Sequence, residues 1–347
     1  MKNSPIPFPF LSHRPFGFRP SLPYFTPKNG LFYPQEAPFY LLKHLFLHLK
    51  SVFRLFPLQM RKRCQIVRHF LFFLFLLGFT SCSSLRYAGV DRIARFEVSS
   101  PDVTDELDGY RIAFASDFHL PSRFRERQLQ GAVKALNALQ PDLVLLGGDY
   151  QETCDYADTL FAALGQCRPA DGIWAVMGNN DFERCADIIV LAMRRNGIHL
   201  LDYDTVTIRP GLVVAGVPFC THPPLVEPVT NALNPEDFVV LFTHSPDIAE
   251  TLPLTPDRVD LTLAGHTHGG QITFFYLFAP ETASRYGQKF LAGRRTNSRG
   301  VPVITSRGLG TSRIPVRFCA PTDIVFVTLA KPKNAKMPIS SGKMRGK

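Results

Sequence analysis

The sequence feature that most constrains the fold is a series of short apolar runs, most of which end in polar residues. Three such runs, at 111–118, 142–149 and 173–180, are apolar almost throughout. Segments with helical spacing separate them, at 123–139 and, less regularly, at 155–165. Strands that are apolar on both faces are typical of buried parallel sheets. The alternation of strand and helix therefore predicts a parallel sheet covered by helices.

After a third helical segment, at 182–196, the chain is richer in strands. The predicted strands lie at 198–208, 211–217, 239–244, 261–266, 301–305 and 323–329. A β-rich second half predicts a second sheet packed on the first. We expect an α/β fold: a four-layer sandwich of two mixed β-sheets flanked by helices. It would occupy 108–330 as one domain, after a connector that ends near Gly109, and about 220 residues suffice for one buried core.

The basic charge of the chain lies outside this domain. The formal net charge is +10, and residues 1–69 alone have a net charge of +10. The tail at 331–347 adds six basic residues and no acid, which leaves 70–330 at −6. Nucleic-acid-binding domains are usually basic, so we expect no nucleic acid as partner. Basic segments beside apolar sequence instead fit an anionic membrane surface.

The first part of the chain, residues 1–59, is a basic extension rich in proline and phenylalanine. It carries ten of the 29 prolines, which preclude regular helix or central strand over most of its length. Its apolar and basic stretch at 39–56 fits a helix lying on a membrane surface. The alternative is that 1–59 is absent from the mature protein, because a start at Met60 explains the following residues better.

Residues 60–82 have the pattern of a signal peptide or a membrane anchor. Basic residues at 61–63 precede an apolar run of ten residues at 70–79. This run is short for a membrane span, which needs about 20 residues, but fits a signal-peptide core. It ends in Phe79-Thr80-Ser81-Cys82, which resembles a bacterial lipobox apart from its first residue. We expect association with a bacterial inner membrane, either as a lipoprotein through Cys82 or through an anchor that leaves the domain on the cytoplasmic side.

The seven cysteines form no CxxC pair, so the sequence predicts neither a zinc knuckle nor a thioredoxin motif. Five of them follow Cys82, and this odd number argues against a disulfide framework. We therefore expect buried, small apolar side chains, which mildly favours the cytoplasmic alternative.

Polar clusters follow five of the predicted strands, and in open α/β sheets ligands bind beyond the carboxyl ends of strands. In Asp117-x-His119 and His266-x-His268, residues two apart share a side of an extended segment and can reach one centre. Mixed imidazole, carboxylate and amide ligands suit manganese, iron or zinc. We expect two divalent metal ions and the following ligands: Asp117, His119, Asp149, Asn179, His244, His266 and His268.

Each motif alone is a weak signal, because a single histidine at a strand end is more often part of the core than a ligand. Their order makes the signal strong. SDFHL (116–120), LGGDY (146–150), MGNND (177–181), FTHSPD (242–247) and GHTHGGQ (265–271) resemble the calcineurin-like metallophosphoesterase family. The segment 308–329 looks like that of a bacterial membrane-associated branch, which includes an enzyme that cleaves UDP-2,3-diacylglucosamine in lipid A synthesis.

The resemblance implies a division of the ligands between two metal ions that share Asp149. One ion would be held by Asp117, His119, Asp149 and His268, and the other by Asp149, Asn179, His244 and His266. Such a pair activates water and stabilises charge for displacement at phosphorus. We therefore expect a hydrolase for a phosphate ester or phosphoanhydride, acting on a phosphorylated small molecule or a lipid at a membrane surface.

Asn180 is a departure from the family pattern, which commonly reads GNHD with histidine as the general acid. An amide cannot supply a proton at a useful pKa, so we expect a substrate with a good leaving group, such as a phosphate released from a pyrophosphate. Asn180 and Asp181 are predicted to hydrogen-bond substrate oxygens. The alternative is a binding or regulatory protein with a metal centre and little turnover. Arg307, Arg313 and Arg317 are expected on the solvated surface, and the alternative is that they bind a phosphate or an acidic head group.

Overall fold

The computed structural model describes residue 69 and residues 85–86, 89–219, 227–231, 233–275 and 277–332. The predicted extension at 1–59, the predicted signal peptide or anchor apart from residue 69, and nearly all of the basic tail lie outside these residues. The chain divides into units at 1–73 and 74–347, and the second is described below. In the described part of the chain, no helix has the length and apolar character needed to cross a membrane.

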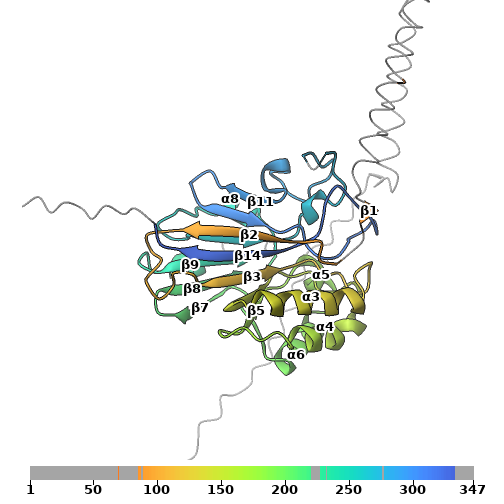
Figure 1. The fold of residues 1–347 in the computed structure, drawn as a ribbon, viewed down its shortest axis with the longest axis horizontal. Helices are drawn as coiled ribbons and strands as arrows, with labels where there is room; N and C mark the ends of the chain where they lie inside the picture. Colours follow the sequence, from red (N-terminus) through yellow and green to blue (C-terminus); the bar gives the residue numbers. More distant parts are fainter. Residues whose placement is uncertain are drawn as a thin grey trace, which may run out of the picture. The chain divides into compact units, whose positions relative to one another are not determined.

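One sheet carries the first three predicted strands, and we call it the first sheet (Figure 1). In order across the sheet, its strands are β2 (Arg92–Ser99), β14 (Asp323–Ala330), β3 (Arg111–Ala115), β4 (Leu143–Leu146), β5 (Ile173–Ala175) and β6 (Ile198–Leu200). Strands β3 to β6 are parallel, and β14 runs antiparallel to β3. Its outer face is covered by α3 (Glu126–Leu139), α4 (Ala157–Leu164) and α6 (Ala186–Arg195).

The second sheet is built from the β-rich second half of the domain. In order, its strands are β11 (Gly293–Thr296), β12 (Pro302–Thr305), β10 (Leu261–Ala264), β9 (Phe238–Thr243), β8 (Leu212–Val217) and β7 (Asp204–Arg209). Its outer face packs against short helical segments: α7 (Glu227–Asn231), α8 (Ile248–Thr251) and η4 (Gly287–Phe290).

The main core lies between the two sheets. Ile112 and Phe114 from β3 pack there with Val240 and Phe242 from β9, all fully buried. Burying one such side chain contributes roughly 1.5–3 kcal/mol. The predicted four layers are confirmed: helices, two mixed sheets and further helices.

Three boundaries differ from the prediction. Strand β2 lies inside the predicted connector, so the sheet begins at Arg92. Its sequence, RIARFEVS, mixes polar and apolar residues and is only partly buried, unlike the apolar runs that predicted the other strands. The predicted strand at 198–208 is two strands, β6 and β7, in different sheets. The predicted helix at 182–196 is two helices, α5 (Asn179–Arg184) and α6, which meet at Cys185.

The cysteine prediction is wrong for one pair. Cys154 and Cys185 form a disulfide, with Cα atoms 5.5 Å apart and a sequence separation of 31. Neither lies in a CxxC motif, so only the fold brings them together. Cys167 and Cys319 are buried as predicted, and burial raises the pKa of the Cys167 thiol to about 11.

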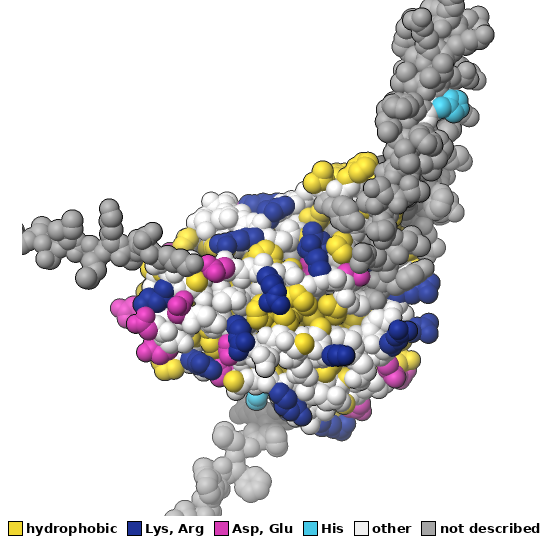
Figure 2. Space-filling view, viewed as in Figure 1, with side chains coloured by type: hydrophobic (Ala, Val, Ile, Leu, Met, Phe, Trp, Pro, Cys, Tyr) yellow, Lys and Arg dark blue, Asp and Glu magenta, His cyan; other side chains and the backbone are white. Residues whose placement is uncertain are grey.

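Charge is unevenly distributed over the domain surface. Figure 2 shows a face on which Lys and Arg side chains are spread over the region of β2 and α3, while Asp and Glu side chains gather near two of its edges. The acidic net charge of the domain therefore does not give every face an acidic character.

Candidate metal centre

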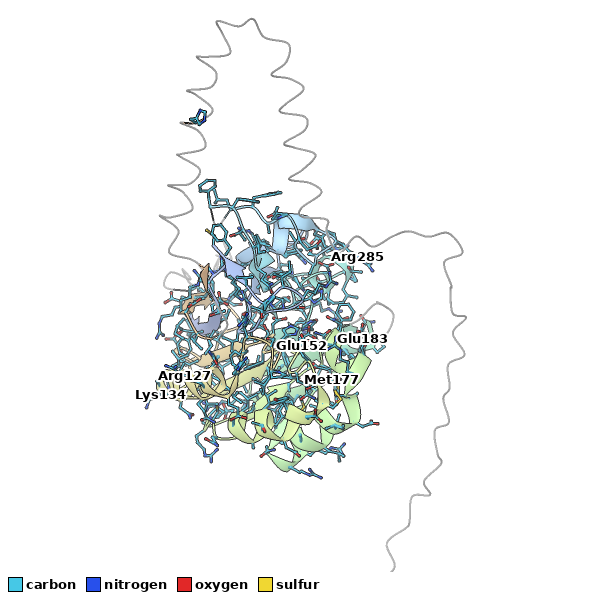
Figure 3. The ribbon with its side chains drawn as sticks, turned by 90° about the vertical axis from the view of Figure 1, so that its right-hand side faces the viewer. Arg127, Lys134, Glu152, Met177, Glu183 and Arg285 are labelled. Carbon is cyan, nitrogen blue, oxygen red and sulfur yellow. A yellow bond between two sulfur atoms is a disulfide. The ribbon has the colours of Figure 1, made fainter. Side chains whose placement is uncertain are left out.

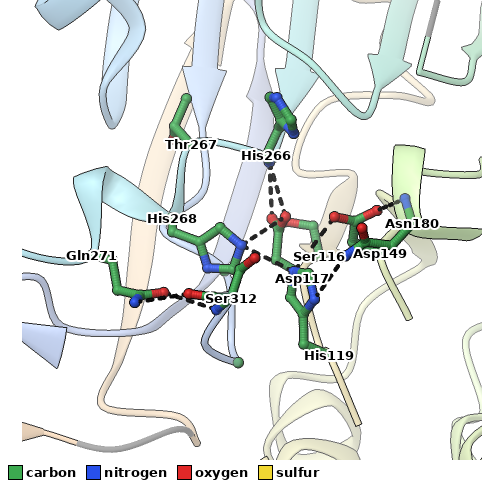
Figure 4. Close-up of polar contacts among 12 residues, drawn as sticks. Ser116, Asp117, His119, Asp149, Asn180, His266, Thr267, His268, Gln271 and Ser312 are labelled. Carbon is green, nitrogen blue, oxygen red and sulfur yellow. Dashed lines mark hydrogen bonds and ion pairs between the residues drawn. The ribbon is translucent and has the colours of Figure 1, made fainter. Parts of the chain in front are cut away.

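All seven predicted ligands follow the carboxyl ends of strands, and five of them are labelled in Figure 4. Asp117 and His119 follow β3, Asp149 follows β4, and Asn179 begins α5 after β5. From the second sheet, His244 follows β9, and His266 and His268 follow β10. The structure thus brings together residues up to 151 positions apart in sequence.

Asp117, His119 and His268 form a group that could hold a metal ion, and we call it the first trio. His268 Nε2 lies 3.0 Å from His119 Nε2 and 3.5 Å from Asp117 Oδ1. All three side chains are buried. Two imidazole nitrogens and a carboxylate oxygen therefore point to one position with little access to bulk water.

Asp149, His244 and His266 form a second group of the same kind, the second trio. His266 Nδ1 lies 3.0 Å from His244 Nε2, and Asn179 Oδ1 lies 3.2 Å from the same His244 nitrogen. Asn179 therefore extends the trio to four oxygen and nitrogen donors. His266 is partly exposed, so this group is the more open of the two.

Asp149 connects the two groups. Its Oδ2 lies 3.4 Å from His119 Nε2 in the first trio and 3.5 Å from His244 Nε2 in the second. Its other oxygen, Oδ1, accepts a hydrogen bond from the backbone N–H of Asn180. This is the position that a carboxylate shared by two metal ions would occupy.

The backbone around the ligands is strained. Five of the seven have a positive φ, with values from 48° to 70°: Asp117, His119, Asp149, His266 and His268. Non-glycine residues rarely adopt this conformation, and such residues cluster at functional sites. The left-handed turns direct successive ligands from strand ends into one centre.

Gly178 is required by the close approach of two ligand-bearing segments. A Cβ at this position would lie 2.1 Å from Asp149 Oδ1 and 2.5 Å from Asp149 N. Any larger residue would displace the carboxylate that joins the two trios. The glycine before Asn179 is therefore fixed by sterics at the centre rather than by turn geometry alone.

The electrostatic environment favours cation binding at several of these side chains. Burial lowers the pKa of His268 well below its usual range, and His119 and Arg317 lower it further. Burial and the neighbouring His244 lower the pKa of His266 to about 3. Both imidazoles are therefore neutral near pH 7, the state in which a ring nitrogen can bind a metal. His244 differs: burial lowers its pKa, but the Asp149 carboxylate outweighs this and raises it to about 9.

Glu152 supports the first trio and was not among the predicted site residues. Its Oε1 lies 2.7 Å from His119 Nδ1, and its Oε2 accepts a hydrogen bond of 2.7 Å from Arg184. A carboxylate that holds the outer nitrogen of an imidazole orients the inner nitrogen toward a metal. The disulfide joins the same two segments, since Cys154 and Cys185 lie close to Glu152 and Arg184 in the chain.

Arg317 is also part of the centre, and the expectation of a solvated side chain is wrong. It is fully buried and donates hydrogen bonds to the backbone oxygens of His268, Gly310, Ala320 and Arg307. Its Nη2 also lies 3.1 Å from His268 Nδ1. The sequence does not indicate this role, because four of the five contacts are with backbone oxygens. Arg313 is exposed, as expected, whereas Arg307 is mostly buried and pairs with Asp323.

Asn180 and Asp181 occupy different environments. The Asn180 amide is half-buried and lies 3.2 Å from His119 Nδ1, at the margin of the centre. Asp181 is fully buried, and its carboxylate accepts hydrogen bonds from the backbone N–H groups of Asp149, Tyr150 and Gly178. This geometry differs from the predicted substrate contact: Asp181 joins the segments after β4 and β5.

The donor set fits two divalent metal ions. Each trio presents carboxylate oxygen and imidazole nitrogen, and Asn179 adds an amide oxygen. Such mixed sets suit manganese, iron or zinc. In each trio two imidazole nitrogens lie 3.0 Å apart, so they converge on one position, as two ligands of one cation would.

Comparison with known proteins agrees with this geometry. The profile of the calcineurin-like phosphoesterase family matches residues 110–270. A Bacillus subtilis metallophosphoesterase named YkuE, itself described as uncharacterized, is 28% identical over 242 residues, covering 67% of this chain and 83% of its own length. An uncharacterized metallophosphoesterase of Aquifex aeolicus is 29% identical over 228 residues, covering 63% and 84%.

Solved structures similar to this chain include a dimetal phosphatase from Danio rerio. It has 14% sequence identity and a TM-score of 0.39, and the match covers 64% of this chain and 99% of that protein. Over residues 110–270 the domain matches the calcineurin-like phosphoesterase family, and the two curated relatives are described as metallophosphoesterases. It is a metallophosphoesterase, a hydrolase of phosphoesters with a site for two metal ions.

Proposed function

We propose that this protein hydrolyses a phosphoester or pyrophosphate bond in a lipid-linked substrate at a membrane, using the seven side chains of the centre as metal ligands. The observation that carries the proposal is the position of Asp149, whose Oδ2 lies within 3.5 Å of a histidine from each trio. Two metal ions held there would supply Lewis acidity and activate a water for in-line attack on phosphorus.

The residues of the chain have separate tasks in this proposal. Glu152 fixes the ring of His119, and the carboxylate of Asp181 holds the backbone of Asp149 in place. Asn180 lies at the margin of the centre, where its amide can hydrogen-bond a phosphate oxygen. Asp181 is assigned a positioning role because its carboxylate is already committed to three backbone N–H groups.

The absence of histidine at position 180 favours a substrate whose leaving group departs without being protonated. A phosphate released from a pyrophosphate is a good leaving group, whereas an alkoxide needs a general acid. A nucleotide-diphosphate-linked lipid, such as UDP-2,3-diacylglucosamine, has this chemistry. Two observations support a membrane setting: the basic and apolar sequence at 39–82, and a Danio rerio relative named a transmembrane protein with metallophosphoesterase domain, 26% identical over 258 residues.

The test is a set of hydrolysis assays on the metal-supplemented protein. We expect hydrolysis of UDP-2,3-diacylglucosamine and of an aryl phosphodiester, and little hydrolysis of an alkyl phosphodiester. Inactivity toward all three with both metal ions bound would favour the alternative of a binding or regulatory protein.

Asn180→His tests the leaving-group argument directly. The substitution supplies the missing proton donor, so we expect it to accelerate alkyl phosphodiester hydrolysis by about 10²-fold, within the usual contribution of a general acid. Pyrophosphate cleavage should change little. Equal effects on the two substrates would remove the argument from position 180.

A further inference from the structure

An unusual cluster of exposed apolar side chains follows the last metal-binding motif. Phe275, Leu277 and Phe278 have exposed fractions of 60%, 80% and 52%. We call these three residues the apolar tip. Large apolar side chains gathered on a surface mark a contact with a protein or a membrane, whereas single exposed ones are ordinary.

The backbone of the apolar tip is a closed turn. Phe274 N–H donates to Phe278 O at 2.7 Å, and the N–H groups of Leu277 and Phe278 both donate to Phe274 O. Three backbone N–H groups of the turn are therefore satisfied within it, while apolar side chains are exposed. Backbone hydrogen bonds closed in this way are what entry into an apolar phase requires.

The base of this turn is fixed to the metal centre. Gln271, three residues after His268, donates through its side chain to Ser312 O and accepts from Ser312 N–H. On the other side, Ala279 exchanges two hydrogen bonds with the Gln288 side chain. Both ends of the turn are thus tied down, one to the segment that follows His268 and the other to η4.

Two exposed arginines lie on segments connected to the apolar tip. The Gln271 side chain also contacts the segment that carries exposed Arg313 and Ile314, the latter 43% exposed. Arg285 is exposed on the segment that leads from the tip to η4 and is labelled in Figure 3. Among the residues that the structure describes, neither arginine forms an ion pair. Glu281 is the exposed acid on the same segment.

The N-terminal part of the chain joins the domain beside this turn. Strand β1 (Leu85–Arg86) pairs with β13 (Arg317–Phe318), and Phe318 also bridges Ile272 at the start of the turn. β1 follows Cys82, the last residue of the predicted signal peptide or anchor, by three positions. An anchor at 60–82 would thus be followed, three residues later in the sequence, by a strand that pairs beside the turn.

We propose that the apolar tip, with Arg285 and Arg313, is a docking surface for an anionic phospholipid bilayer. Phe275, Leu277 and Phe278 would enter the interface between headgroups and acyl chains, and the two arginines would face anionic headgroups. The docking surface would bring the metal centre to a phosphate at the membrane surface. This part of the inference rests on the proposed function.

The test uses the full chain in vesicles of phosphatidylglycerol and brominated phosphatidylcholine, in which bromine quenches tryptophan that enters the bilayer. Trp174 is the single tryptophan, so Leu277→Trp is made in a Trp174→Phe background. Leu191→Trp in the same background is the matched control, because Leu191 is 51% exposed on α6, which covers the first sheet. We expect strong quenching and a shorter emission wavelength for the Leu277→Trp protein alone. Equal quenching of both, or none at position 277, would overturn the docking surface.

A second variant links the surface to substrate use. Leu277→Asp should lower hydrolysis of a lipid-linked substrate in anionic vesicles about 10-fold or more, since a charge replaces an inserted apolar group. Hydrolysis of a water-soluble aryl phosphodiester should stay unchanged. Equal rates on the vesicle substrate would contradict the proposal. If the parent hydrolyses none of these substrates, the proposed function fails, and the quenching result still decides the docking surface.

Discussion

The two trios offer metal ions the same donor types but differ in what surrounds them. The first trio is buried and is supported by charged side chains: Glu152 at His119, and Arg317 at the backbone of His268. In the second trio, His244 Nδ1 instead contacts a backbone oxygen, Gly147 O, at 2.7 Å, and His266 is partly exposed.

This difference indicates that the two metal positions differ in how tightly they hold an ion and in how much room they leave for substrate. A buried site whose ligands are oriented by other side chains binds its ion tightly, because the ligands need little ordering. A more open site leaves room for substrate oxygens. We therefore expect the ion at the first trio to exchange slowly and the ion at the second to exchange faster, with Asp149 common to both.

Replacing Asp149 should weaken metal binding at both trios, because each of them loses a ligand. Asp149→Ala is expected to lower aryl phosphodiester hydrolysis by about 10³-fold or more, since the two ions act as one catalytic unit. Metal content, measured by plasma emission spectroscopy, should fall below two per chain. Asp158→Ala, an exposed carboxylate on α4, is the control and should retain both ions. Two tightly bound ions in Asp149→Ala would contradict the shared-ligand assignment.

Breaking the disulfide should weaken the structure that holds the first trio. Cys154→Ser with Cys185→Ser removes a cross-link over a sequence separation of 31 residues, which is worth about 3–4 kcal/mol in the free energy of unfolding. Denaturant titration measures this loss. A thiol reductant should lower the free energy of unfolding of the wild type and leave that of the double variant unchanged. Unchanged stability in the double variant would show that the cross-link does not form in solution.

Removing the charge of Glu152, which contacts His119, should lower metal affinity at the first trio more than at the second. Glu152→Gln is expected to lower the affinity for one ion by about 10–100-fold and leave the other nearly unchanged. Glu183→Gln makes the same change of charge on an exposed side chain of α5, and both residues are labelled in Figure 3. Competition with a chelator measures the two affinities. An equal loss at both positions, or similar losses in both variants, would argue against a specific role for Glu152.

The smallest effect concerns Asp202, which supports the segment leading to Asn179 by accepting a hydrogen bond from Met177 N–H. Burial raises the pKa of Asp202 to about 7. Its contribution to stability is therefore complete below pH 4 and is lost as the pH rises through 7. Asn keeps the acceptor without the charge, so Asp202→Asn should raise the melting temperature at pH 8 by about 2–4 °C and change it little at pH 4. A larger gain at pH 4 than at pH 8 would contradict this.

The sequence predicted the strand-end ligands because each lies directly after a continuous apolar run, and parallel strands bring their carboxyl ends to one edge. It could not predict Glu152 or Arg317, because their partners are set by tertiary folding: Arg317 meets His268 across 49 residues and binds backbone oxygens. The disulfide was hidden for the same reason. Strand β2 was missed because it is half-exposed, and its place in the sheet depends on pairing with β14, more than 220 residues later.

The central claim is that Asp149 joins two metal positions in one phosphoesterase centre. Electron paramagnetic resonance of the metal-free protein titrated with Mn²⁺ tests it most directly, because ions that share a ligand couple magnetically. We predict a coupled spectrum that reaches its maximum at two Mn²⁺ per chain, together with the onset of aryl phosphodiester hydrolysis. Saturation at one Mn²⁺ per chain, or two uncoupled ions in an active protein, would contradict the account.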